Sequence, residues 1–149
     1  MRTIDAIAVH HSASLIGTLT WDRIRSIHVS ERGFRDVGYH FGVWRDRSSG
    51  EFVVRLGRDT ADTGAHVRGH NADTIGVCFE GNFEVQQMQP RQRDVGAELV
   101  ANLCKQYGLT EASVIPHRSF DGAATLCPGQ WFPIHSLRGM VRDRLEWVK

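Results

Sequence analysis

Apolar positions in this chain fall into two patterns, short continuous runs and runs at helical spacing. Continuous runs favour buried strands, because a strand that is covered on both faces is apolar throughout. Such runs predict strands over residues 4–11, 39–45, 51–56, 74–80 and 113–115. Helical spacing predicts helices over residues 18–32, 90–107 and 133–148. Strands and helices are interspersed, which indicates an α/β domain with a central mixed sheet flanked by about three helices.

Several local signals set the limits of these elements. Thr20 is placed to cap the first helix, and Pro90 and Gly108 mark the start and the end of the second. The turn at residues 48–50 joins two strands into a hairpin. Residues 57–73, rich in Gly, Asp and His, predict a long surface loop, a kind of segment that is often functional. The apolar stripes predicted for the last two helices are Val95, Leu99, Leu103 and Tyr107, widened by Val100 and Cys104, and Ile134, Leu137, Val141, Leu145 and Val148.

The composition is that of an ordinary globular protein. Of 149 residues, 41% are apolar and 23% are charged, and the net charge is +1, so we expect one domain over residues 1–149. The near-neutral charge argues against nucleic acid as a partner, because duplex binders usually carry a basic face. Asp5 interrupts any signal segment, and no stretch reaches the roughly 18 apolar residues of a spanning helix. We therefore expect a monomer made in the cytoplasm, without a membrane partner.

The three cysteines differ in their surroundings. An odd number of widely spaced cysteines argues against a disulfide framework. Cys78 lies in a predicted strand and Cys104 on the apolar side of a predicted helix, so both are predicted to be core residues. Cys127 lies in a loop beside Pro128 and Gly129, where no core pattern runs. It is therefore the cysteine that we expect to carry chemistry.

The chain holds 8 histidines, of which some lie where predicted strands end. His10 lies near the end of the first strand, and His117 follows the last one. Together with Cys127 they offer two nitrogen ligands and one sulfur ligand, a set that suits zinc with one open position. Spacing alone leaves a second chemistry level with this one, a Cys127 thiolate nucleophile with His117 as its base. His28 and His135 fall within helices and are interpreted as surface or partly buried side chains.

Five short motifs follow one another in order along nearly the whole chain. They are Ala8-Val9-His10-His11-Ser12-Ala13, Val37-Gly38-Tyr39-His40-Phe41, Gly64-Ala65-His66-Val67-Arg68-Gly69-His70-Asn71, His117-Arg118 and Thr125-Leu126-Cys127-Pro128-Gly129. In this order they resemble the N-acetylmuramoyl-L-alanine amidase type 2 family, which includes small phage lysozyme-amidases and animal peptidoglycan recognition proteins. Five ordered motifs are more specific than any one of them, so the resemblance favours zinc over thiol chemistry.

The resemblance implies a role for each matching residue. His10, His117 and Cys127 would bind one zinc ion at one edge of the sheet, with Cys127 as a thiolate. Tyr39 would lie beside the metal as a catalytic residue that orients water, moves a proton or steadies an oxyanion. Thr125 stands where some phage members have lysine, and it would stabilise the oxyanion by a hydrogen bond without a positive charge.

By the same resemblance, His66 and Asn71 would line the substrate groove. Apart from the resemblance, His11 and His40 are expected to point into the core or to support a ligand. The implied reaction is hydrolysis of the amide between N-acetylmuramic acid and the L-alanine of the peptidoglycan stem peptide. A family member without a signal or a second wall-binding domain is typical of a phage or prophage endolysin. The alternative is a recognition domain that binds peptidoglycan without cleaving it, although such proteins usually lack the cysteine ligand.

Overall fold

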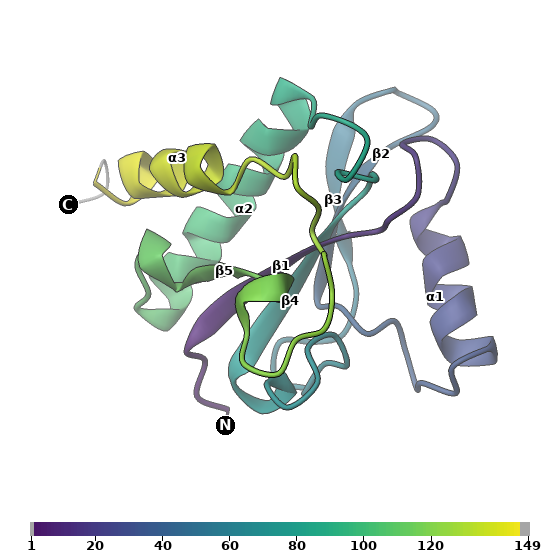
Figure 1. Cartoon of the computed structure of the whole chain (residues 1–149), viewed down its shortest axis with the longest axis horizontal. Helices are drawn as coiled ribbons and strands as arrows, with labels where there is room; N and C mark the ends of the chain where they lie inside the picture. Colours follow the sequence, from purple (N-terminus) through teal and green to yellow (C-terminus); the bar gives the residue numbers. More distant parts are fainter. Residues whose placement is uncertain (1, 147–149) are drawn as a thin grey trace.

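A five-stranded sheet with helices on both faces forms the body of the protein (Figure 1). The computed structural model describes residues 2–146. Its strands are β1 (Ala6–His11), β2 (Phe41–Arg45), β3 (Phe52–Leu56), β4 (Thr74–Phe79) and β5 (Val114–Pro116). Its helices are α1 (Trp21–Ser30), α2 (Pro90–Tyr107) and α3 (Ile134–Glu146), and short 3-10 turns cover Asn71–Asp73, Glu111–Ser113 and His117–Ser119. The predicted α/β class is confirmed, with element ends that differ by a few residues from the predicted ones.

The strands lie in the order β3-β2-β4-β1-β5. β1 runs parallel to its neighbours β4 and β5, and β2 runs parallel to β4. β2 and β3 form the antiparallel hairpin that the turn at residues 48–50 predicts, so the sheet is mixed. Because the carboxyl ends of parallel strands meet at one edge of a sheet, side chains that end β1 or follow β5 can converge there.

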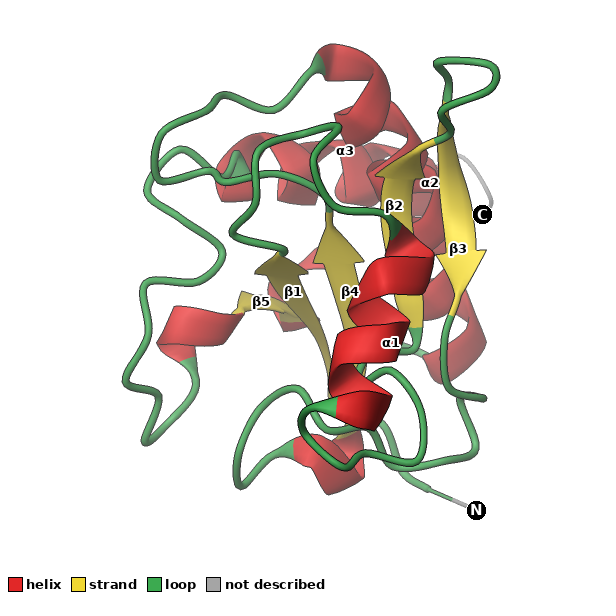
Figure 2. Ribbon diagram, turned by 90° about the vertical axis from the view of Figure 1, so that its right-hand side faces the viewer, coloured by secondary structure: helices red, strands yellow, loops and turns green. Residues whose placement is uncertain are grey.

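Helix α1 covers one face of the sheet, and α2 and α3 cover the other (Figure 2). Strand β4 serves both faces, because alternate strand residues point to opposite sides. Ile75, Val77 and Phe79 enter the larger core, together with buried residues of α2 and α3. The smaller core on the α1 face consists of Trp21, Ile24, Val37, Trp44 and Cys78.

Helix α2 begins and ends as its proline and glycine signals predict, but its buried face is rotated from the predicted one. Of the six residues of the predicted stripe, Leu103 and the two that widen it, Val100 and Cys104, are fully buried, and the other three are partly exposed. A Cβ atom on Gly96 would lie 2.3 Å from the Phe79 ring, so the helix approaches the sheet through a residue without a side chain. The buried residues of the helix are Gln92, Gly96, Ala97, Val100, Ala101, Leu103 and Cys104.

The other two helices follow the predicted patterns with one correction. Thr20 caps α1, and its side chain accepts a hydrogen bond from the Arg23 N–H. His28 is fully buried, not at the surface or partly buried as predicted, because its ring packs inside the fold. In α3, Ile134, Leu137 and Val141 are buried as predicted, and the predicted position Val148 lies outside the described residues. None of the helices within residues 2–146 is long and apolar enough to cross a membrane.

Candidate metal centre

The two adjacent histidines at the end of β1 point to opposite faces of the sheet. His10 is 2% exposed and lies on the α1 face, in register with Cys78 of β4. The His11 side chain lies on the other face, where its Nδ1 accepts a hydrogen bond of 3.1 Å from the Phe83 N–H. Strand alternation therefore assigns His10 to the site and His11 to the core, as the sequence predicts.

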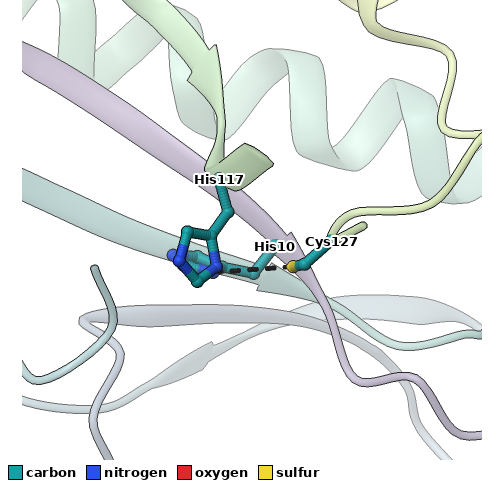
Figure 3. Close-up of side chains that lie close together, drawn as sticks. All are labelled: His10, His117 and Cys127. Carbon is teal, nitrogen blue, oxygen red and sulfur yellow. Dashed lines mark hydrogen bonds between the residues drawn. The ribbon is translucent and has the colours of Figure 1, made fainter. Parts of the chain in front are cut away.

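Three side chains from separate segments converge beside the end of β1 (Figure 3). His10 is the penultimate residue of the strand, His117 begins the 3-10 turn after β5, and Cys127 lies in the following loop. Their ligand atoms all lie within 4.8 Å of one another, and the Cys127 Sγ is 3.8 Å from the His10 Nδ1. The structure thus brings together the three residues that the sequence predicts as metal ligands.

Hydrogen bonds from backbone and side chains hold the Cys127 loop against this cluster. The Cys127 carbonyl accepts from the Arg118 N–H at 2.8 Å, and the Arg118 guanidinium donates to the Gly129 carbonyl at 3.1 Å. The His11 N–H points at the Cys127 Sγ at 3.4 Å, and the Cys127 N–H donates to the Thr125 Oγ1 at 3.2 Å. Because the loop that follows His117 is fastened to the cysteine loop, the two candidate ligands keep a fixed separation.

Burial keeps the cluster uncharged. Desolvation lowers the pKa of His10 well below its ordinary value, and the neighbouring His66 and His117 add to that effect. Burial raises the pKa of the Cys127 thiol to about 11, although the His11 N–H and Arg118 oppose the shift. A pair of neutral imidazoles and a thiol that a cation would deprotonate is a donor set suited to zinc. These residues therefore fit a single zinc ion.

Tyr39 lies beside the cluster, just before β2. Its ring centroid is 5.1 Å from that of His10 and 6.4 Å from that of Trp21 in α1. Burial raises the pKa of Tyr39 well above its ordinary value, with Cys78 and Cys127 contributing, so its hydroxyl keeps its proton. The preceding residue is held by His28, whose Nδ1 accepts a hydrogen bond of 2.9 Å from the Gly38 N–H.

His66 and Asn71 lie in the loop over residues 57–73, behind His10. His66 is 8% exposed, and its Nδ1 lies 2.9 Å from the His10 Nε2. Burial lowers the pKa of His66 well below its ordinary value, with His40 as the next contributor. The Asn71 Oδ1 accepts from the backbone N–H groups of His66 and Val67 at 2.8 and 2.9 Å. Their predicted contact with substrate stays a prediction, and the contacts present here are internal.

Sequence reasoning passed over three residues that support the site. His28 holds the chain before Tyr39, Thr74 lies 3.2 Å from the His66 ring, and Gly76 leaves room for that ring. A signal for the last two was present, because residues 74 and 76 alternate with the core-facing residues of β4. His28 carried no such signal, since its partner is a backbone N–H on another segment.

Residues 1–130 match the family described as N-acetylmuramoyl-L-alanine amidase, and the chain belongs to this family. The endolysin of Enterobacteria phage T3 is 36% identical over 137 residues, which are 85% of this chain and 81% of that protein. Peptidoglycan-recognition protein SD of Drosophila simulans is 31% identical over 125 residues, 83% of this chain but 61% of that protein.

A solved structure agrees with these sequence relatives. N-acetylmuramoyl-L-alanine amidase LysC from Clostridium intestinale URNW superimposes with a TM-score of 0.79 at 29% identity. The superposition covers 93% of this chain and 85% of that one. The family match, the endolysin and this amidase together support a peptidoglycan amidase.

Proposed function

We propose that the protein is a zinc-dependent N-acetylmuramoyl-L-alanine amidase that acts as a phage or prophage endolysin. It would hydrolyse the amide between N-acetylmuramic acid and the L-alanine of the peptidoglycan stem peptide. The observation that carries the proposal is the cluster of His10, His117 and Cys127, whose ligand atoms lie within 4.8 Å of one another. Amidase and endolysin relatives supply the substrate class.

The cluster would hold one zinc ion through two imidazole nitrogens and the Cys127 sulfur. A bound zinc ion supplies a Lewis acid that polarises a carbonyl and acidifies water. His10 is buried at the base of the cluster, whereas His117 and Cys127 are half-buried, so the side nearer solvent is the one open to a substrate.

Two further side chains would act on the reacting atoms. Tyr39 keeps its proton and lies beside His10, so its hydroxyl can donate to an oxyanion or to a leaving nitrogen. In the part of the chain that the structure describes, the Thr125 Oγ1 accepts from the Cys127 N–H, which leaves its own O–H able to donate. A threonine brings no positive charge, so Tyr39 would supply the stronger of the two hydrogen bonds.

The weak acidity of the Cys127 thiol argues against the alternative in which Cys127 acts as a nucleophile. A nucleophilic cysteine needs a lowered pKa so that it is a thiolate near neutral pH. Burial raises the pKa of the Cys127 thiol to about 11 instead. A thiol of this kind is a poor nucleophile, whereas a metal ion can displace its proton.

The products released from peptidoglycan distinguish an amidase from a recognition domain that binds without cleaving. The purified protein is expected to bind about one zinc ion and to release new alanine amino termini from peptidoglycan without new reducing sugars. Binding to walls without new amino termini would support a recognition domain, and new reducing ends would indicate a glycosidase.

The ligand set is tested by Cys127→Ser, with Cys104→Ser in α2 as the matched control. Cys127→Ser is expected to lower zinc affinity and amidase activity by roughly 100-fold or more, because even supporting partners of a ligand contribute 10–100-fold. Cys104→Ser is expected to keep both, since Cys104 packs in the core on the far face of the sheet. Full zinc content and activity in Cys127→Ser would refute the assignment of Cys127 as a ligand. Wild-type activity that resists a chelator but is lost when a thiol is alkylated would favour the thiol mechanism.

A further inference from the structure

We propose that His66 and Thr74 form a hydrogen-bonded chain that fixes the tautomer of His10 and directs its Nδ1 lone pair at the metal centre. In this assignment both are positioning residues, and they act on the reaction only through His10. The inference rests on the proposed function, because it describes how the protein prepares one of the zinc ligands before the ion binds.

The chain runs from the metal cluster to a backbone carbonyl through three short contacts. The His10 Nε2 lies 2.9 Å from the His66 Nδ1, and the His66 Nε2 lies 3.2 Å from the Thr74 Oγ1. The Thr74 hydroxyl donates to the His70 carbonyl at 2.8 Å. The other nitrogen of His10, Nδ1, faces the Cys127 Sγ at 3.8 Å.

The carbonyl at the end of the chain sets the direction of every bond in it. A carbonyl only accepts, so the single hydroxyl proton of Thr74 goes to His70. The Thr74 oxygen must then accept from His66, which places the His66 proton on Nε2 and leaves its Nδ1 as an acceptor. His10 must in turn donate from its Nε2. A neutral His10 with its proton on Nε2 presents a bare Nδ1 to the cluster.

The scheme requires a neutral His66, and its surroundings supply that condition. Within residues 2–146, the side-chain hydrogen-bond partners of its ring are His10 and Thr74, neither of which is an acid. An imidazolium buried at 8% exposure without an anionic partner would be costly. The neutral ring is the form that the three contacts can satisfy.

Glycines fix the place of the His66 ring. A Cβ atom on Gly76 would lie 2.7 Å from the His66 Cγ, and one on Gly64 would lie 2.7 Å from its Cδ2. The ring therefore occupies a slot between β4 and its own loop that any larger residue would close. Asn71 fastens the loop, since its Oδ1 accepts from the His66 and Val67 N–H groups. Packing and hydrogen bonds thus converge on one orientation of the ring.

A ligand histidine with a fixed tautomer binds metal more tightly, because no free energy is spent on moving its proton or turning its ring. Partners of this kind typically contribute about 10–100-fold to metal affinity or activity. His66→Phe keeps a planar ring but removes both bonds, so its zinc affinity is expected to fall by about 10–100-fold. His66→Asn keeps an acceptor near the position of Nδ1 and is expected to recover part of that loss.

Thr74 provides the sharper comparison, because Thr74→Val keeps the shape of the side chain and removes the hydroxyl, whereas Thr74→Ser keeps the hydroxyl and removes a methyl group. Chelator competition on the zinc-loaded protein is expected to give Thr74→Ser the wild-type affinity and Thr74→Val a lower one. Long-range ¹H–¹⁵N spectra of the same variants in metal-free form report which nitrogen of each ring carries the proton. They are expected to place it on Nε2 of both His10 and His66 in wild type and Thr74→Ser, and to show His66 divided between tautomers in Thr74→Val.

The outcomes separate this inference from the proposed function. A wild-type protein that binds no zinc would refute both, whereas zinc binding and amidase activity with unchanged affinity in His66→Phe and Thr74→Val would refute the chain alone. A proton on the His66 Nδ1 in the wild-type spectrum would also refute it. Should His66→Phe fail to fold, the Thr74 pair and the wild-type spectrum still decide the question.

Discussion

The same substitution in two helices is predicted to have opposite effects on stability. Gly96 of α2 faces the sheet, and a Cβ atom there would lie 2.3 and 2.5 Å from two carbons of the Phe79 ring. Carbon atoms in contact sit about 3.5–4.0 Å apart, so the ring would have to move by about 1 Å. Phe79 is fully buried, and its ring lies 5.2 Å from that of Phe132, so it has little room to move.

Gly139 of α3 is the matched control, because the nearest atom to a Cβ there is the Arg142 Nη2 at 3.9 Å. Replacing a helical glycine by alanine gains about 0.5–1 kcal/mol. Gly139→Ala is therefore expected to raise the free energy of unfolding by that amount. In Gly96→Ala the same gain is opposed by about 1–3 kcal/mol of overpacking, which leaves a net loss of up to about 2.5 kcal/mol.

Urea unfolding of both variants beside the wild type measures these differences. The slope of the free energy of unfolding against urea is expected to stay constant, so that the midpoints alone report stability. A Gly96→Ala protein as stable as Gly139→Ala would refute the close approach of α2 to Phe79 and, with it, the explanation of the rotated buried face.

Two further predictions concern the α1 face of the sheet. Tyr39→Phe keeps the ring beside His10 and removes only the hydroxyl, so hydrolysis is expected to fall by about 100-fold or more while zinc affinity holds; wild-type turnover in a peptidoglycan hydrolysis assay would exclude the hydroxyl from the reaction. Burial lowers the pKa of His28 from 6.5 to about 4, so its contribution to stability is complete above pH 6.5 and is lost as the pH falls toward 4. His28→Asn, which keeps an acceptor for the Gly38 N–H, is expected to flatten the fall in urea midpoint between pH 7 and 4.5, and an unchanged fall would contradict that assignment.

The order and kind of the elements were predictable because their signals are local. Pro90 and Gly108 mark the limits of α2, and the turn at residues 48–50 marks the hairpin, without help from distant residues. The buried face of α2 was not predictable in the same way. It is set by the ring of Phe79, which only tertiary contact brings against Gly96.

In the candidate site, too, some residues could be predicted from the sequence and others depend on the fold. Residue chemistry proposed His10, His117 and Cys127 but left a thiol nucleophile level with zinc, and it was the order of five motifs that favoured the metal. The inward role of His28 could not be foreseen, because its partner is a backbone N–H that the fold brings close. Strand alternation indicated that Thr74 faces the α1 side of the sheet, but its contact with the His66 ring depends on the fold.

Strand β4 explains why so small a sheet can carry both a core and a buried polar site. Its large residues, Ile75, Val77 and Phe79, all point toward α2 and α3. The alternate residues, Thr74, Gly76 and Cys78, are small, and they pair in register with Ala6, Ala8 and His10 of β1. Small residues on that face leave a space next to His10, and the loop over residues 57–73 fills it with the ring of His66. Enlarging this face would therefore disturb the metal centre before the core, whereas trimming the opposite face would do the reverse.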